Sequence, residues 1–86
     1  MEKNFYTTDS LTVSAVILAS IPGSEAKIVE NDSPRKTFRI TYLSQYKVEL
    51  LLLLDEYSKH TARVNVFAYC KKLNLLRDLL NGRAAL

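Results

Sequence analysis

The residues able to do acid–base or nucleophilic chemistry in this 86-residue sequence are few and widely spaced. His60 is the only histidine, and no second His or Cys stands at metal-ligand spacing from it. Cys70 is the only cysteine, and its place in an apolar helical run predicts a buried small side chain rather than a nucleophile. Asp55 and Glu56 are adjacent, so on a helix they would point about 100° apart and could not form a facing carboxylate pair. The sequence therefore predicts no catalytic residue, no metal site and no cofactor, and a protein that is not an enzyme.

The composition excludes several further classes of protein. With 2 Gly, 2 Pro and 48% hydrophobic residues, the chain is neither disordered nor collagenous, and its length predicts a single domain over 1–86. The glycines also form no phosphate-binding loop, which excludes nucleotide hydrolysis. The apolar stretch 11–21 is too short to cross a bilayer, and no cleavable signal pattern is present. With one cysteine and no internal disulfide, we expect a cytoplasmic protein without membrane contact.

Basic charge gathers in two segments of the chain, although the net charge is only +3. Residues 33–48 contain four basic residues and no acidic one, and 59–86 contain six basic residues against a single acid, Asp78. On a β-hairpin, the first of these clusters would form a ribbon that follows phosphates and could enter a DNA major groove. Edge strands also carry basic residues simply to prevent unwanted pairing. The candidate nucleic-acid-binding residues are Lys27, Arg35, Lys36 and Arg39.

The elements that must position these side chains begin, after a lead-in over 1–6, with a helix over 8–20. Its N-cap comes from the polar run 7–10, and Pro22-Gly23 ends it. Strands over 26–31 and 36–42 follow, joined by the turn cluster 31–34. In the second strand Phe38, Ile40 and Tyr42 alternate with polar residues, which predicts one core face and one solvent face.

Two further helices are expected, over 44–58 and 65–81. Ser44 and Asn65 would cap them, and Gly82 would end the last one. The resulting order is helix, strand, strand, helix, helix, which is an α+β fold with an antiparallel β-hairpin packed against three helices. Because two strands alone are marginally stable, the hairpin must lie against the helices or pair with a symmetry mate.

The helix over 44–58 is unusually rich in leucine. A stripe of Leu50, Leu51, Leu54 and Tyr57 would face the core, whereas Leu52 and Leu53 fall partly outside it and need a second cover. The third helix could provide that cover within one chain. Otherwise Leu52 and Leu53 form an exposed interface for a protein partner, most simply in a symmetric homodimer.

Three segments carry a resemblance to a known family: Tyr6-Thr7-Thr8-Asp9-Ser10-Leu11 with the following Ser14-Ala15, the strand Thr37-Phe38-Arg39-Ile40, and Ala62-Arg63-Val64-Asn65 before the last helix. Together they resemble a family of small domains of unknown function found in bacteria, archaea and viruses. Members of that family usually have a more acidic second helix and a proline where this chain has Val66. The resemblance implies the fold and implies no activity.

The sequence thus favours a small, non-enzymatic binding module. We expect a homodimeric, nucleic-acid-associated accessory protein that contacts DNA or RNA through its basic hairpin. The alternative is a protein–protein adaptor or inhibitor that self-associates, or binds a partner, through the leucine-rich second helix.

Overall fold

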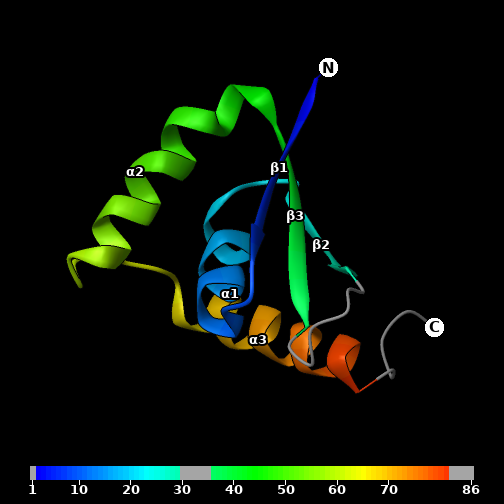
Figure 1. Ribbon diagram of the computed structural model, residues 1–86. Helices are drawn as coiled ribbons and strands as arrows, with labels where there is room; N and C mark the ends of the chain where they lie inside the picture. Colours follow the sequence, from blue (N-terminus) through cyan, green and yellow to red (C-terminus); the bar gives the residue numbers. More distant parts are fainter. Residues whose placement is uncertain (1, 30–35, 82–86) are drawn as a thin grey trace.

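The centre of the molecule is strand β3 (Thr37–Leu43) in a three-stranded antiparallel sheet of order β1-β3-β2 (Figure 1). It is seen in a computed structural model that describes residues 2–29 and 36–81. Strands β1 (Lys3–Thr8) and β2 (Glu25–Val29) flank β3 and are each antiparallel to it. Three helices, α1, α2 and α3, complete the domain. The expected α+β class, with a hairpin and three helices in one small domain, is confirmed.

Strand β1 corrects one part of the sequence analysis. Residues 1–6 were expected to be a lead-in, and the helix was expected to begin at residue 8. Instead Lys3–Thr8 pairs along nearly the whole of β3, from Lys3 opposite Leu43 to Thr8 opposite Phe38. The backbone N–H of Ser44 extends this pairing by donating to the carbonyl of Glu2 at 3.0 Å. The third strand that a stable sheet requires therefore comes from the start of the same chain.

The two faces of the sheet differ because successive side chains of a strand point to opposite sides. Phe38, Ile40 and Tyr42 of β3 are buried, as the alternation predicted, and they pack with α1 residues such as Ile17. All three helices lie on this side of the sheet, while the other side carries no described helix (Figure 1). The fold is therefore two-layered, with one sheet face open.

Helix α1 (Leu11–Ser20) connects β1 to β2 and lies against the buried face of the sheet, to the left of β3 in Figure 1. Ser10 is its N-cap, since the Ser10 side chain accepts a hydrogen bond from the backbone N–H of Val13 at 3.1 Å. After the helix, the backbone N–H of Ser24 donates to the carbonyl of Ile21, and Gly23 takes φ +73°. This is the pattern of a turn that needs glycine at its third position, so Pro22-Gly23 stops the helix as expected.

Helix α2 (Lys47–Ser58) follows a 3₁₀ turn over Ser44–Tyr46. The prediction that Ser44 caps this helix is wrong, because its buried hydroxyl has no hydrogen-bond partner among the described residues. Leu50 and Leu53 are the buried residues of α2, whereas Leu51 is 57% exposed and Leu52 is 59% exposed. The prediction that Leu53 lies at an interface is therefore wrong, since Leu53 belongs to the core, and Leu51 is not part of the buried stripe.

Helix α3 (Val66–Leu80) packs against α1 and β2. Asn65 is its N-cap as expected, with the side-chain oxygen accepting from the Ala68 backbone N–H at 3.0 Å. Cys70, expected in the core, is exposed. The expected end of the helix at Gly82 lies outside the described residues. Within the part of the chain that is described, the structure has no helix of the length and apolarity needed to cross a membrane.

Candidate nucleic-acid interface

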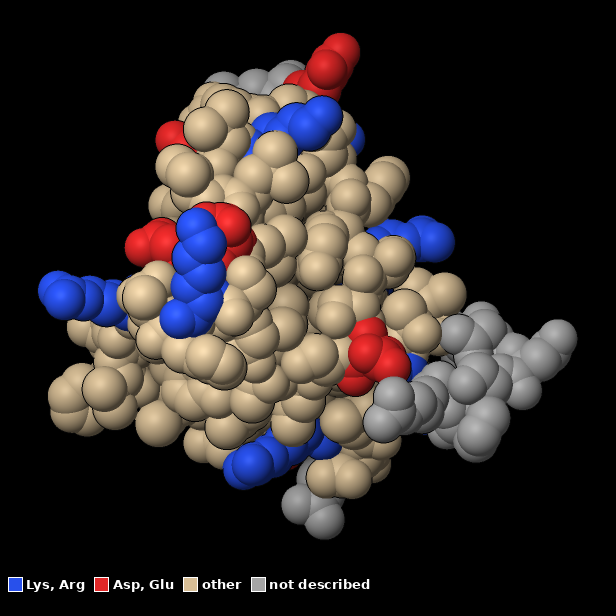
Figure 2. Space-filling model, turned by 60° about the vertical axis from the view of Figure 1, so that its left-hand side comes forward, with Lys and Arg blue, Asp and Glu red and all other residues tan. Residues whose placement is uncertain are grey.

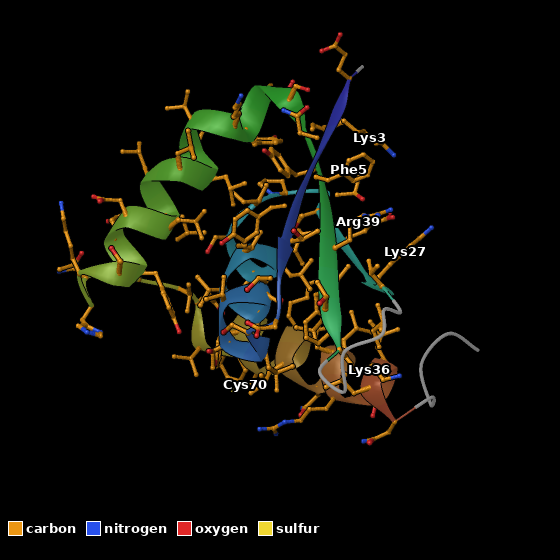
Figure 3. The ribbon with its side chains drawn as sticks, viewed as in Figure 1. Lys3, Phe5, Lys27, Lys36, Arg39 and Cys70 are labelled. Atoms are coloured by element: carbon orange, nitrogen blue, oxygen red, sulfur yellow. The ribbon has the colours of Figure 1, made fainter. Side chains whose placement is uncertain are left out.

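The open face of the sheet gathers basic side chains from all three strands. Lys3, Phe5, Lys27 and Arg39 point away from the helices on this face (Figure 3). Each of them is exposed, as the alternation of the strands requires. We call these four residues the basic face.

Strand register brings the basic face together. Lys27 of β2 is directly opposite Arg39 of β3, and Arg39 is directly opposite Thr7 of β1. Neighbouring strands are about 4.8 Å apart, so Lys27 and Arg39 present two positive charges side by side. This register therefore brings two of the predicted residues, Lys27 and Arg39, side by side.

An aromatic ring lies beside these charges. The Phe5 side chain is 62% exposed, and the Arg39 guanidinium carbon lies over its ring, 5.4 Å from the centroid. That distance is within the range of a cation–π interaction, which contributes about 0.5–1 kcal/mol at an exposed site. The contact holds the guanidinium against the ring on the solvent side of the sheet.

The other predicted residues are placed differently. Lys36 is exposed, but it precedes the first residue of β3 and lies at the end of the sheet near α3, away from Lys27 and Arg39 (Figure 3). Arg35 lies outside the described residues. The structure therefore brings together two of the four predicted basic residues and adds Lys3 and Phe5 from β1. The neighbouring residues Tyr6, Thr7 and Thr8 favour a strand, and this signal could have revealed the position of Lys3 and Phe5.

One carboxylate shares the open face. Glu25 of β2 is exposed and lies two residues before Lys27 on the same side of the strand. It is opposite Thr41, which in turn is opposite Phe5. Glu25 would repel phosphates at this corner of the sheet, so the attractive surface runs from Lys3 past Phe5 to Arg39 and Lys27.

The residues considered for catalysis are not assembled into a site. His60 is exposed and takes φ 61°, because it is the left-handed residue that ends α2. The backbone N–H of His60 donates to the Tyr57 carbonyl, and that of Thr61 donates to the Glu56 carbonyl at 2.8 Å, which is the Schellman pattern.

A hollow of about 400 Å³ lies beside His60, lined by Thr12, Tyr57 and Tyr69 among others. The Thr12 and Tyr57 hydroxyls are hydrogen-bonded to each other at 3.1 Å, so this hydrogen bond ties α1 to α2. Over residues 2–29 and 36–81 no three His, Cys, Asp or Glu side chains are grouped as metal ligands.

Comparisons with protein-family models, with curated proteins and with solved structures found no match. The resemblance to small domains of unknown function therefore stays a prediction, and the function is argued from the surface itself.

Proposed function

We propose that the protein is a non-enzymatic module that binds nucleic acid through the basic face of its sheet. The observation that carries the proposal is the alignment of Lys27 and Arg39 across neighbouring strands, with Lys3 on the same open face. Phosphate contacts of this kind provide most of the affinity of sequence-independent nucleic-acid binding. The backbone of a DNA or RNA strand would lie across the three strands of the sheet.

The salt dependence of binding follows from the number of cations. Three phosphate contacts, by Lys3, Lys27 and Arg39, give a slope of log K against log salt of about −2 on a single strand and about −2.7 on duplex DNA. Such a slope corresponds to weak binding by one copy of the chain. The affinity should therefore be measured at low salt.

The test compares two double variants that remove the same charge. Lys27→Gln with Arg39→Gln removes two cations from the basic face, and Lys71→Gln with Arg77→Gln removes two exposed cations from α3. Fluorescence anisotropy with labelled oligonucleotides at two salt concentrations should show a large loss of affinity, with a slope reduced by about 1.4 on a single strand, for the first variant only. Equal losses in both variants would mean that net charge alone causes binding and would contradict the proposal.

A second candidate function is self-association through α2, and a separate observation favours it. Val48, Leu51 and Leu52 are more than half exposed on the side of α2 opposite to the buried Leu50 and Leu53. A helix that is apolar on both sides is normally covered on both sides. Figure 2 turns α2 toward the viewer, and charged groups of both signs are scattered there among uncharged residues.

We propose a second copy of the chain as the occupant of this outer side of α2. The side also carries Asp55 and Lys59, which form their own ion pair at 3.0 Å, so these two charges stay paired when two copies meet there. Three side chains provide much less than the roughly 800 Å² per partner of a standard interface, so the dimer should be weak. Glu49 and Glu56 flank the apolar residues, and salt that screens their mutual repulsion should strengthen the dimer.

Sedimentation across a range of protein concentrations tests this second candidate. The wild type should show a mass that rises with concentration and with salt, and Leu52→Gln should remain a monomer with an unchanged fold. A matched exposed substitution on another helix, Leu75→Gln, should leave the self-association intact. A wild-type protein that stays monomeric at the highest concentration would contradict the dimer.

A further inference from the structure

We infer that the natural ligand of the basic face is a single strand of nucleic acid, with one base stacked on the ring of Phe5. This inference rests on the proposed function and adds to it the class of nucleic acid. The proposed function requires only cations, whereas the inference requires an exposed aromatic ring positioned among them.

The ring of Phe5 is accessible from the solvent side of the sheet. It is 62% exposed, and its cross-strand neighbour is the smaller Thr41. On its own strand the neighbours on the same face are Lys3 and Thr7. The Arg39 guanidinium lies over the ring, 5.4 Å from its centroid, so a base that stacks on Phe5 would take its place there and could then stack against the displaced guanidinium plane. An apolar ring at this position contributes little to the core and offers a stacking surface.

Cations lie on both sides of the ring. Lys3 is two residues before Phe5 on β1, about 7 Å along the strand, and Arg39 with Lys27 lies in the row beyond it. A single strand whose base rests on Phe5 would therefore have a cation near the phosphates that precede and follow that base. Stacking on aromatic side chains between such cations is how single strands are held without sequence preference.

A duplex fits the same face less well. The major groove is about 12 Å wide and admits a helix or a two-stranded ribbon. Here the axes of the two edge strands are already about 9.6 Å apart, before side chains are added, and helices cover the back of the sheet. The base faces of a duplex are also hidden in the stack, so duplex DNA would contact the cations and leave Phe5 unused.

Phe5→Leu tests the inference, with Phe67→Leu as the matched control. Phe67 is an exposed phenylalanine, at 88%, that lies on α3 rather than on the sheet. The probes are a labelled 12-nucleotide oligothymidine, an oligouridine of the same length, and a DNA duplex of the same length. We expect Phe5→Leu to weaken single-strand binding between about fivefold and about 150-fold with an unchanged salt slope, and Phe67→Leu to change it less than twofold.

A second measurement detects stacking directly. The chain contains no tryptophan, so Phe5→Trp introduces a single indole on the basic face. Its fluorescence should be quenched when oligothymidine binds, and the fluorescence of Phe67→Trp should not change. Circular dichroism of each variant checks that the fold is retained.

The possible results separate the inference from the proposed function. If Lys27→Gln with Arg39→Gln weakens binding and Phe5→Leu does not, the inference is wrong and the proposed function stands. Tighter binding of the duplex than of either single strand would also overturn the inference alone. If the wild type binds none of the three probes at low salt, both are wrong.

Discussion

Leu52 and Leu53 are adjacent in the sequence, and the structure predicts that truncating them has very different consequences. Leu53 is 8% exposed and packs in the core, whereas Leu52 is 59% exposed. Leu53→Ala removes buried methyl groups and leaves a cavity, which costs 2–5 kcal/mol in well-packed proteins. Because α2 packs mainly against α1, its surroundings can partly relax, and we expect about 2–3 kcal/mol for Leu53→Ala. Leu52→Ala should change the free energy of unfolding by less than about 0.5 kcal/mol.

The loss of about 2–3 kcal/mol expected for Leu53→Ala is large compared with the total free energy of unfolding. At roughly 0.05–0.15 kcal/mol per residue, a chain of this length has a free energy of unfolding of about 4–13 kcal/mol. The Leu53→Ala variant should therefore melt roughly 10–20 °C below the wild type, while Leu52→Ala should melt close to it.

Urea unfolding followed by circular dichroism measures both effects, at a protein concentration low enough to keep the chain monomeric. At higher concentration the stability of the wild type should rise through self-association, and Leu52→Ala should lose that increase. Equal destabilisation by the two variants in the dilute sample would refute the reasoning, because it would place both leucines in the core of one chain.

Three further substitutions test other parts of the structure. His60→Gly should raise the free energy of unfolding by about 1 kcal/mol in a urea titration, because glycine relieves the left-handed φ, whereas His60→Ala should give no gain. Asn65→Ala should lower it by about 1 kcal/mol by removing the N-cap of α3, and Asn65→Asp should retain most of the stability; an unaffected alanine variant would show that the cap is not needed. Glu25→Lys adds a cation to the basic face and should steepen the salt slope of single-strand binding by about 0.7, while the same charge change in Glu49→Lys on α2 should not; equal effects would argue against a localised site.

Strand β3 could be predicted from sequence because its pattern is unambiguous. Phe38, Ile40 and Tyr42 alternate with polar residues, and this period fits only a strand with one buried face. The alternation also predicted that Arg39 points to the solvent face of the strand. The register that places Lys27 opposite Arg39 is known only from the structure, because the sequence predicted an antiparallel hairpin without a register.

Strand β1 was not predicted because its apolar and polar positions are exchanged relative to the core. Its most apolar residue, Phe5, points to solvent, and the inward positions are Asn4, Tyr6 and Thr8. In addition, Thr7 and Thr8 also suit the N-cap of a helix, so local chemistry favoured an earlier start of α1. Half of the basic face, Lys3 and Phe5, depends on this strand, so that half was not predicted.

The errors in predicting which sides of α2 and α3 are buried have a related cause. Cys70 was expected in the core because it lies in an apolar helical run, but it is exposed, and the inward side of α3 carries the half-buried Tyr69 and Leu73 and the buried Leu76. In α2, apolar residues occupy nearly every position from 50 to 54, so the sequence alone does not show which side faces the core. Tertiary packing against α1 decides that Leu53 is inside and Leu51 outside.

The two proposed surfaces respond to salt in opposite directions, and this gives a way to separate them in one sample. Binding of nucleic acid to the basic face weakens as salt rises, because releasing counterions into a more concentrated salt solution gains less entropy. Self-association through α2 strengthens, because screening reduces the repulsion around Glu49 and Glu56. The two surfaces lie on different elements, so a dimer would leave both basic faces available (Figures 1 and 3). At intermediate salt, Leu52→Gln should therefore lower the apparent affinity for an oligonucleotide long enough to reach both copies, and should leave the affinity for a short one unchanged.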